Sequence, residues 1–213
     1  MLLIIVALLI SYLIGSIPTA YLFGRVLKGI DIRKAGSGNV GATNALRILG
    51  KGPGIAVLFL DILKGFLVVV FLGNYLADKP VLLTTQNMRI LMGLSCICGH
   101  NWTIFLQFKG GKGIATTFGV LLGLALKIAG LNSVIGLLIL VWFIVFFIFR
   151  IVSLASICSA IVFPVFSLFF KLPLTLIALS LLLCVFVIIR HKANLARIFR
   201  GKEPRLYFKK PTN

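Results

Sequence analysis

Residues 134–189 read VIGLLILVWFIVFFIFRIVSLASICSAIVFPVFSLFFKLPLTLIALSLLLCVFVII, and this stretch decides the fold class. Its only charged residues are Arg150 and Lys171. A helix needs about 20 apolar residues to cross the ~30 Å hydrocarbon core of a membrane. The stretch is therefore long enough for three membrane-spanning helices, divided near Arg150 and at Lys171 with Pro173. At Arg150, one long bent segment or two helices fit the pattern.

The rest of the chain is also strongly apolar. The 213 residues are 60% hydrophobic, and the mean hydropathy is +1.14. Four more spans are expected at residues 2–23, 55–76, 88–105 and 113–126, separated by polar stretches at 24–52, 77–87 and 127–133. Pro18 falls late in the first span, where it kinks the helix or ends a turn. The sequence predicts an all-α integral membrane bundle of about seven helices, forming one membrane-embedded domain over residues 1–213.

The distribution of basic residues along the chain indicates its orientation in the membrane. With seven spans and the N-terminus outside, the inner segments hold 17 of the 22 Lys and Arg residues and the outer segments hold four. The positive-inside rule then favours an external N-terminus and a cytoplasmic C-terminus. The first apolar run lacks a basic leader and a clear cleavage site, so we expect it to be a retained span. The net charge of +18 indicates anionic partners at one membrane face, either phosphate substrates or acidic lipid. The basic segments are too short for a nucleic-acid module.

Cysteine and histidine give little sign of metal chemistry. Cys96, Cys98, Cys158 and Cys184 all lie in apolar surroundings and are typical of small core residues. Cys96 and Cys98 with His100 form too small a ligand set for a metal on an apolar helix. We therefore expect no metal and no other cofactor.

The first polar loop, residues 35–47, reads AGSGNVGATNALR. It matches G-x-G-x-x-G, and Asp61 follows at about the distance of a dinucleotide fingerprint, but no buried strand precedes it. Glycines still allow backbone N–H groups to approach an anion. A tight loop is the alternative. The predicted phosphate site comprises Gly36, Ser37, Gly38, Asn39, Gly41, Thr43, Asn44 and Arg47.

The second loop, residues 109–116, reads KGGKGIAT. The spacing of a P-loop is not met, because Leu106 stands where glycine is needed and Gly113 where Ser or Thr is needed. What remains is a turn that opens a helix and can hold a phosphate through backbone amides and a lysine. An inner-face membrane anchor is the alternative, above all for Lys109. The predicted binding residues are Gly110, Gly111, Lys112 and Gly113.

Two further sets of polar residues stand out at helical spacing. His191, Asn194 and Arg197 lie at i, i+3 and i+6, so on one helix they fall within a sector of about 120°. A basic tail on acidic lipid is the alternative. Asp61 and Lys64 lie at i and i+3 inside a span, where charges are costly and usually pair. They either pair structurally or close a site from the membrane side.

Three segments resemble, in this order, the three cytoplasmic motifs of the bacterial PlsY family of acyl-phosphate-dependent glycerol-3-phosphate acyltransferases. They are residues 36–44, residues 99–102 through 110–116, and residues 191–197 with 201–203. The resemblance covers the whole chain; Val40 departs from it, at a position where proline is common. It implies transfer of a fatty acyl group from acyl phosphate to the 1-hydroxyl of glycerol 3-phosphate. The products are lysophosphatidate and phosphate, made at the cytoplasmic face of the bacterial inner membrane. By position, the resemblance assigns activity to Ser37, Arg47, Lys112, His191 and Asn194, and a structural role to Glu203.

The residue pattern fits this chemistry. Two phosphate-bearing substrates account for two anion loops together with Lys64 and Arg197, with Asp61 as a structural partner. Acyl phosphate is already activated, so neither a cofactor nor an obligate protein partner is expected. Direct attack by the glycerol hydroxyl is favoured, because Ala35 breaks the G-x-S-x-G pattern of a nucleophilic serine. The base is His191 or a phosphate oxygen of the substrate. A small transporter or channel for an anionic solute or lipid is the alternative function.

Overall fold

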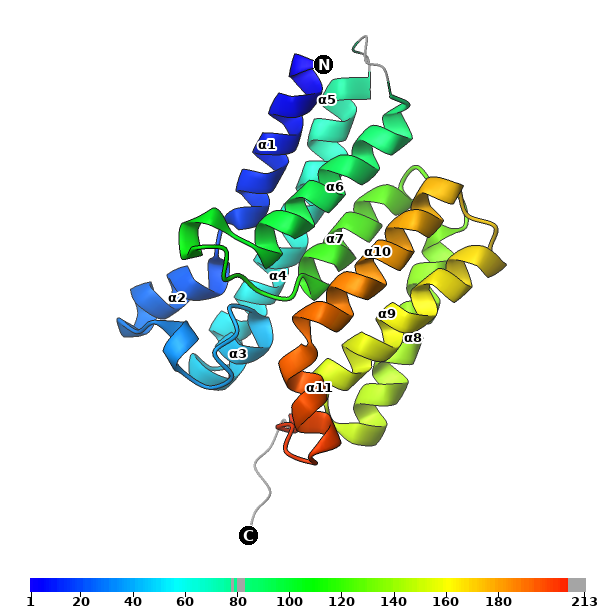
Figure 1. Cartoon of the computed structure of the whole chain (residues 1–213). Coiled ribbons are helices and arrows are strands. Elements are labelled where there is room, and N and C mark those ends of the chain that lie inside the picture. The colour runs from blue at the N-terminus through cyan, green and yellow to red at the C-terminus, as the bar shows by residue number, and fades with distance from the viewer. Residues whose placement is uncertain (78, 80–82, 207–213) are drawn as a thin grey trace. The chain divides into compact units, whose positions relative to one another are not determined.

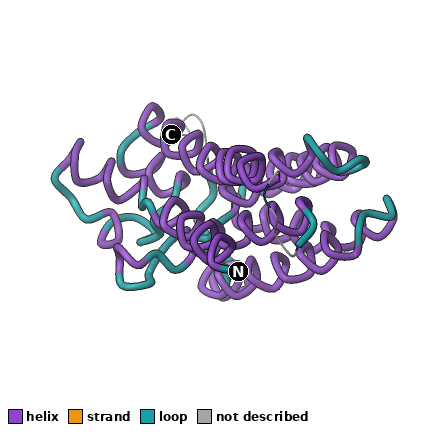
Figure 2. The backbone as a smooth tube through the Cα atoms, turned by 90° about the horizontal axis from the view of Figure 1, so that it is seen from above, coloured by secondary structure: helices purple, strands orange, loops and turns teal. Residues whose placement is uncertain are grey.

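Helices make up almost all of the computed structural model, which describes residues 1–77, 79 and 83–206 (Figures 1 and 2). Over these residues no strand is present. The chain divides into two compact units, Met1–Ile128 and Ala129–Asn213. The all-helical fold class predicted from the sequence is confirmed.

Unit 1 contains α1 to α7. Its helices are α1 (Leu2–Ser16), α2 (Thr19–Lys28), η1 (Ile32–Lys34), α3 (Ala42–Ile48), α4 (Lys51–Leu67), η2 (Val68–Leu72), α5 (Gly73–Ala77), α6 (Thr85–Asn101), η3 (Ile104–Leu106) and α7 (Ile114–Ala125). Here η1 and η3 are 3₁₀ turns and η2 is a π-helical turn. Within the unit, α1 packs against α6, α3 against α4, and α4 against α7.

Glycines allow two of these helix pairs to approach closely. A β-carbon at Gly15 of α1 would collide with the backbone of Cys96 in α6. In the same way, a β-carbon at Gly119 of α7 would collide with the carbonyl of Ile62 in α4. Close approach of backbones at a small residue is common where membrane helices associate, because lipid gives no hydrophobic drive to hold them together.

The helix boundaries agree only in part with those predicted from the sequence. The predicted break at Pro18 within the first span is confirmed, since α1 stops at Ser16 and α2 begins at Thr19. The predicted loop over residues 24–52 is wrong in detail: α2 runs on to Lys28, and α3 forms within it. The third predicted span, 88–105, is also shifted, because α6 begins at Thr85 and ends at Asn101. The stretch 77–87 is only partly among the described residues.

Unit 2 contains α8 (Leu131–Phe149), α9 (Val152–Phe169), α10 (Leu174–Arg190) and α11 (Lys192–Phe199). Arg150 adopts φ +59°, a left-handed conformation that stops α8. Two helices therefore meet at Arg150, and the bent-segment alternative is excluded. Lys171 has φ +50°, and Pro173 then opens α10. α9 packs against both α8 and α10.

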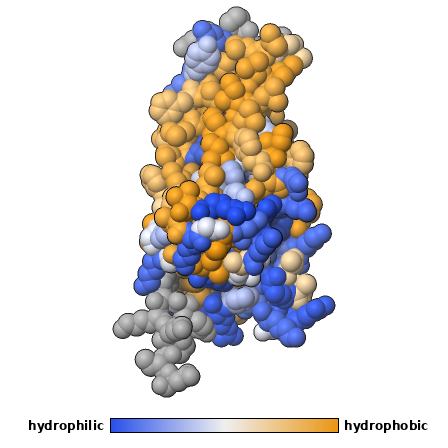
Figure 3. Space-filling model, turned by 90° about the vertical axis from the view of Figure 1, so that its left-hand side faces the viewer, coloured by the Kyte–Doolittle hydropathy of each residue, from blue (hydrophilic) through white to orange (hydrophobic). Residues whose placement is uncertain are grey.

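Among the residues that the structure describes, four helical segments are long and apolar enough to cross a membrane. They are Leu2–Lys28, Lys51–Leu76, Leu131–Phe149 and Val152–Phe169, and a fifth is added if α10 and α11, bent by 62°, count as one span. The apolar helix α7 has only 12 residues. On the face shown in Figure 3, hydrophobic residues cover most of the upper part and hydrophilic residues gather in the lower part. The chain is thus a multi-pass membrane protein, with fewer long spans than the predicted seven.

Candidate active site

The buried amide of Asn44 holds the first polar loop. Its Nδ2 donates to the carbonyls of Ile32, Ala35 and Asn39 at 3.2, 3.1 and 3.0 Å. Its Oδ1 accepts the backbone N–H of Ser37 at 2.9 Å. Both amide hydrogens and one oxygen lone pair are thus engaged by the loop itself. The side-chain amide of Asn44, which the sequence predicts to bind phosphate, is therefore occupied by the loop itself.

Two glycines give the loop its turn. Gly36 and Gly38 adopt φ +59° and +71°, which residues with a β-carbon rarely adopt. Between them the Ser37 side chain is exposed, whereas Val40 is buried among Ala20, Ile32 and neighbouring apolar side chains. The valine that departs from the family pattern therefore anchors the loop through packing. The other predicted residues of the loop lie as follows: Gly41 precedes α3, Thr43 and Arg47 are half-buried on it, and Asn39 is half-buried before it.

The second loop folds back over the end of α6. The N–H groups of Gly110 and Gly111 donate to the carbonyls of Asn101 and His100 at 3.2 and 2.9 Å. These two amides close the C-terminal end of α6, where the last carbonyls lack helical partners, and their contact with a phosphate stays a prediction. Gly113 adopts φ +77° and precedes α7, and Lys112 beside it is half-buried.

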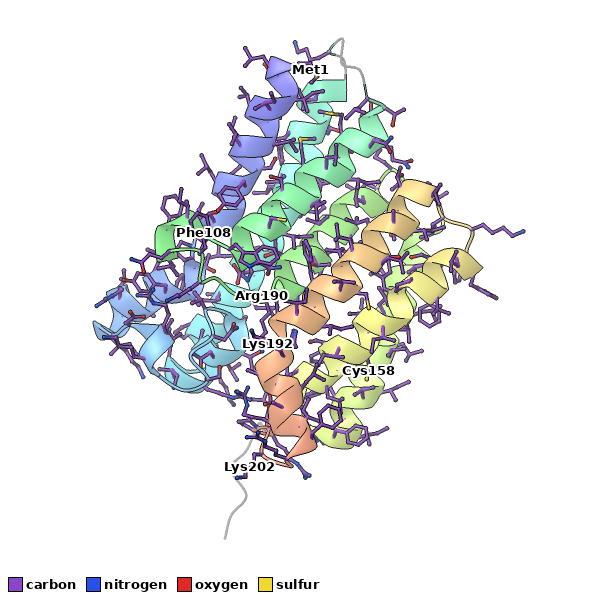
Figure 4. All side chains as sticks on the ribbon, viewed as in Figure 1. Met1, Phe108, Cys158, Arg190, Lys192 and Lys202 are labelled. Atoms are coloured by element: carbon purple, nitrogen blue, oxygen red, sulfur yellow. The ribbon has the colours of Figure 1, made fainter. Side chains whose placement is uncertain are left out.

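The two loops meet at Gly111. A β-carbon there would lie 2.8 Å from the carbonyl oxygen of Val40 and would collide with His100 Nε2. Exposed Phe108, in the preceding turn, has φ +60° (Figure 4). Within unit 1 the structure thus brings together the first two predicted motif segments, as the sequence suggested.

A buried ionic network lies directly beneath this meeting point. Lys64 Nζ lies 2.8 Å from Asp61 Oδ1, 3.1 Å from the carbonyl oxygen of Ile17 and 2.9 Å from His100 Nδ1. Thr19 adds a hydrogen bond to Asp61 Oδ1 at 2.7 Å. The side chains of Asp61 and Lys64 are only 1% and 6% exposed. The predicted pairing of these two residues is confirmed.

This network bears on the predicted role of Lys64, for which the sequence left structural pairing and closure of a site both open. An ammonium group has three N–H donors, and all three have partners inside the protein. A phosphate contact by Lys64 would break one of these bonds, so the geometry favours the structural alternative. The sequence analysis missed Thr19 and considered the side chain of His100 only as part of a rejected metal-ligand set. A histidine beside Asn101 at the end of an apolar helix was the signal available.

Glu203 organises a second cluster, in unit 2. Its Oε1 accepts hydrogen bonds from Ser153 Oγ at 2.7 Å and Asn194 Nδ2 at 2.5 Å, and its Oε2 pairs with Arg197 Nε at 2.7 Å. Burial of this carboxyl acts to raise its pKa, but the hydrogen bonds and the charge of Arg197 outweigh burial and lower the pKa. These contacts are those of a structural acid, which the resemblance assigned to Glu203.

His191 lies at the break between α10 and α11, between Arg190 and Lys192 (Figure 4). His191 is the N-cap residue of α11, at a 62° bend between α10 and α11, and Asn194 and Arg197 lie within α11 itself. Asn194 and Arg197 do share a face of α11, since both bind Glu203. His191 is 2% exposed, and its Nδ1 lies 2.8 Å from the carbonyl oxygen of Val187. A carbonyl only accepts, so Nδ1 carries the proton and Nε2 is the basic nitrogen of the neutral ring.

No group of three or more potential metal ligands occurs over residues 1–77, 79 and 83–206.

Comparison with known proteins identifies the family. Residues 5–201 match the family model described as glycerol-3-phosphate acyltransferase. Curated proteins of that name from Staphylococcus aureus strains JH9 and Newman are 44% identical over 207 residues, covering 95% of this chain and 98% of theirs.

Two solved structures agree with this result. Both are of PlsY (YgiH), an integral membrane glycerol 3-phosphate acyltransferase, and both are 35% identical in sequence to this chain. The glycerol 3-phosphate form has a TM-score of 0.83 and covers 96% of both chains. The lysophosphatidic acid form has a TM-score of 0.80 and covers 96% of this chain and 95% of its own. The alternative of a transporter or channel gains no support from these relatives. The chain belongs to the PlsY family of glycerol-3-phosphate acyltransferases and is an acyltransferase.

Proposed function

We propose that this enzyme transfers a fatty acyl group from acyl phosphate to the 1-hydroxyl of glycerol 3-phosphate. The products are 1-acylglycerol 3-phosphate and inorganic phosphate, at the start of phospholipid synthesis. The observation that carries the proposal is the match to PlsY over almost the whole of both chains, in forms named for glycerol 3-phosphate and lysophosphatidic acid. Both compounds carry a phosphate group, which suits the basic and glycine-rich segments of this chain.

The transfer proceeds as a direct displacement. The glycerol hydroxyl oxygen attacks the carbonyl carbon of the acyl phosphate and forms the new ester bond. The bond between that carbon and the phosphate oxygen breaks, and phosphate leaves with the electron pair. The hydroxyl proton passes to His191 Nε2 or to a phosphate oxygen of the substrate. No cofactor is needed, because acyl phosphate is already a mixed anhydride, and no obligate protein partner is proposed.

Within this reaction we assign roles to the polar residues of the predicted site. Exposed Ser37 positions a substrate by hydrogen bonding, and Asn194 does so from α11. Arg47 and Lys112 stabilise the negative charge that develops on the carbonyl and phosphate oxygens. Of the other predicted binding residues, Asn39 and Thr43 stay candidates for phosphate contact, and Arg197 combines such a contact with its ion pair to Glu203.

Four residues predicted to bind phosphate have structural roles. Asn44 shapes the first loop, Lys64 neutralises Asp61, and Gly110 and Gly111 close the end of α6. Gly36, Gly38 and Gly113 serve by their left-handed backbone conformation, and Gly41 by leaving space for a substrate.

We propose seven membrane crossings for the chain, with the N-terminus outside and the C-terminus and active site at the cytoplasmic face of the bacterial inner membrane. The division of basic residues, 17 against four, supports this orientation. α7 alone spans about 18 Å at 1.5 Å per residue, less than the ~30 Å core. Its crossing uses the buried glycine turn before it, since irregular backbone is tolerated in a membrane where protein covers it. One acyltransferase domain over residues 1–213 is proposed, because the family match extends across both units.

A single assay tests the activity and the donor. Protein purified in detergent receives acyl phosphate and labelled glycerol 3-phosphate, and lysophosphatidate is measured; acyl-CoA replaces acyl phosphate in a parallel reaction. Product with acyl phosphate alone is expected. Ser37→Ala and Arg47→Gln should each reduce kcat/KM by about 100-fold or more, while Lys51→Gln, a change of an exposed lysine, should leave it unchanged. Product from acyl-CoA alone would overturn the donor assignment.

A further inference from the structure

A cavity of about 200 Å³ lies in unit 1, away from the glycine loops. It is open on one side and is lined by η2, α5, the first turns of α6, and the end of α7 with the residues that follow it. In Figure 1, α5 lies at the end of unit 1 that carries the N-terminus, whereas α3 lies at the other end. The residues that line the cavity are Val70, Asn74, Arg89, Gly123, Leu126 and Lys127.

Arg89 is the buried charge of this cavity. It is 7% exposed, and one of its terminal nitrogens donates to Asn74 Oδ1 at 2.6 Å. Among the residues that the structure describes, no carboxylate lies within 4.0 Å of the guanidinium. A buried guanidinium that has only a neutral amide for a partner is costly in an apolar protein. An anion in the cavity would remove that cost.

The backbone around Arg89 is shaped to seat it. A β-carbon at Gly73 would lie 2.5 Å from Arg89 Cγ and 2.8 Å from its Nε, so the absence of a side chain there makes room for the arginine. The preceding turn, η2 (Val68–Leu72), is π-helical. Such turns inside α-helices are frequent at functional sites. The fold therefore provides a specific recess for the Arg89 side chain. A side chain that simply extends to the membrane surface does not need such a recess.

The rest of the lining indicates what the anion is attached to. Exposed Lys127 adds a second cation, whereas Val70 and Leu126 are apolar and Leu126 is 60% exposed. The volume is below the roughly 300–1,000 Å³ typical of sites that enclose a whole small molecule. A small anionic group whose apolar remainder stays outside fits these features. We propose that the cavity binds the phosphate of an anionic phospholipid headgroup, between Arg89 and Lys127.

Native mass spectrometry of the delipidated full chain in detergent tests this site. Phosphatidylglycerol and phosphatidylcholine are titrated separately, and the dissociation constant of the first bound lipid is measured. We expect phosphatidylglycerol to bind at least fivefold more tightly. Arg89→Gln and Lys127→Gln should each weaken its binding about fivefold, which is the usual effect of one basic residue on anionic lipid. Lys51→Gln, an exposed lysine outside the cavity, is the matched control and should change nothing.

Inorganic phosphate at millimolar concentration tests whether the bound phosphate group belongs to a lipid headgroup or to the free ion. Failure to displace phosphatidylglycerol supports a lipid site, whereas displacement supports the same phosphate chemistry with the free ion as a second ligand. Acyl transfer should stay within twofold of wild type in Lys127→Gln, because the cavity lies away from the glycine loops. Equal lipid binding by wild type and both variants would overturn the proposal.

Asp78 provides a further test, since it is the acid nearest to Arg89 in sequence and lies outside the described residues. If Asp78→Asn lowers the melting temperature as much as Arg89→Gln does, and phosphatidylglycerol stabilises neither the wild type nor the variants, the counter-charge is internal and the lipid site is excluded. If Asp78→Asn retains lipid binding, the site stands.

Discussion

The Lys64 ammonium lies 2.9 Å from His100 Nδ1 and so links two segments that are 36 residues apart in sequence. Because an ammonium only donates, His100 Nδ1 accepts, and the ring proton of the neutral imidazole is on Nε2. Nε2 faces Gly111, so a charge pair buried in α4 supports, through His100, the loop that carries Lys112. The membrane-embedded charges are thereby connected to one of the proposed substrate loops.

Lys64→Met should destabilise the protein by about 3–5 kcal/mol, because it leaves the Asp61 carboxylate buried without its cation. Asp61→Asn should have a similar cost, since it leaves the ammonium unpaired. The double variant should be less damaging than the sum of the two, because both charges are gone. Chemical denaturation in detergent measures all three. Additive effects would show that the two residues act independently.

Gly111→Ala should lower both stability and acyl transfer, because the added methyl collides with His100 Nε2 and presses on the Val40 carbonyl oxygen. We expect kcat/KM to fall at least tenfold and the melting temperature to drop by several degrees. Gly52→Ala is the matched control, since nothing lies within 4 Å of a β-carbon there. If both glycine variants behave alike, the proposed support of the second loop by His100 is wrong.

The sequence predicts best those features that depend on nearby residues. Asp61 and Lys64 are three residues apart, so helical geometry alone predicts their pairing. Pro18 and the polar interruption at Arg150 likewise mark breaks that the structure confirms. The apolar runs reveal a membrane protein because bilayer thickness sets the length of a span.

Features that depend on tertiary packing were not predictable. His100 joins Lys64 only because α6 packs beside α4, and spacing cannot show that. Asn44 resembles a phosphate ligand in sequence, yet the loop folds around its amide. The sequence does not predict the helix break at His191, because the residues on both sides favour helix. Several of the polar residues that suggested ligand contacts instead satisfy backbone groups, which is the usual fate of buried amides.

Asn44→Asp should destabilise the first loop, because a carboxylate oxygen would replace the amino group that donates to three carbonyls. We expect a loss of about 3 kcal/mol in unfolding free energy and a fall in kcat/KM of at least tenfold. Asn132→Asp, at an exposed site in α8, controls for the change in charge. Unchanged stability in Asn44→Asp would mean that the loop keeps its shape without this amide.

Glu203 should make the protein sensitive to acid. Its pKa in the folded protein is lowered, so its ion pair and hydrogen bonds contribute fully above the ordinary pKa of 4.5 and are lost as the pH falls through the folded value. The melting temperature of the wild type should therefore fall below pH 4.5 more steeply than that of Glu203→Gln. Asp31 should follow at lower pH, since its hydrogen bond with Arg33 lowers its pKa to about 2. Parallel curves for wild type and Glu203→Gln would exclude a contribution from the Glu203 cluster.

His191→Gln separates the two candidates for the proton acceptor. A glutamine amide can still donate to the Val187 carbonyl, as Nδ1 does now, but offers no basic nitrogen. If Nε2 accepts the hydroxyl proton, kcat should fall about 10²–10⁴-fold while KM for both substrates stays within threefold. If a phosphate oxygen of the substrate accepts the proton, kcat should change little. Steady-state kinetics with acyl phosphate decide between the two. A change in KM alone would instead assign His191 to substrate binding, and the general-base role would then be lost.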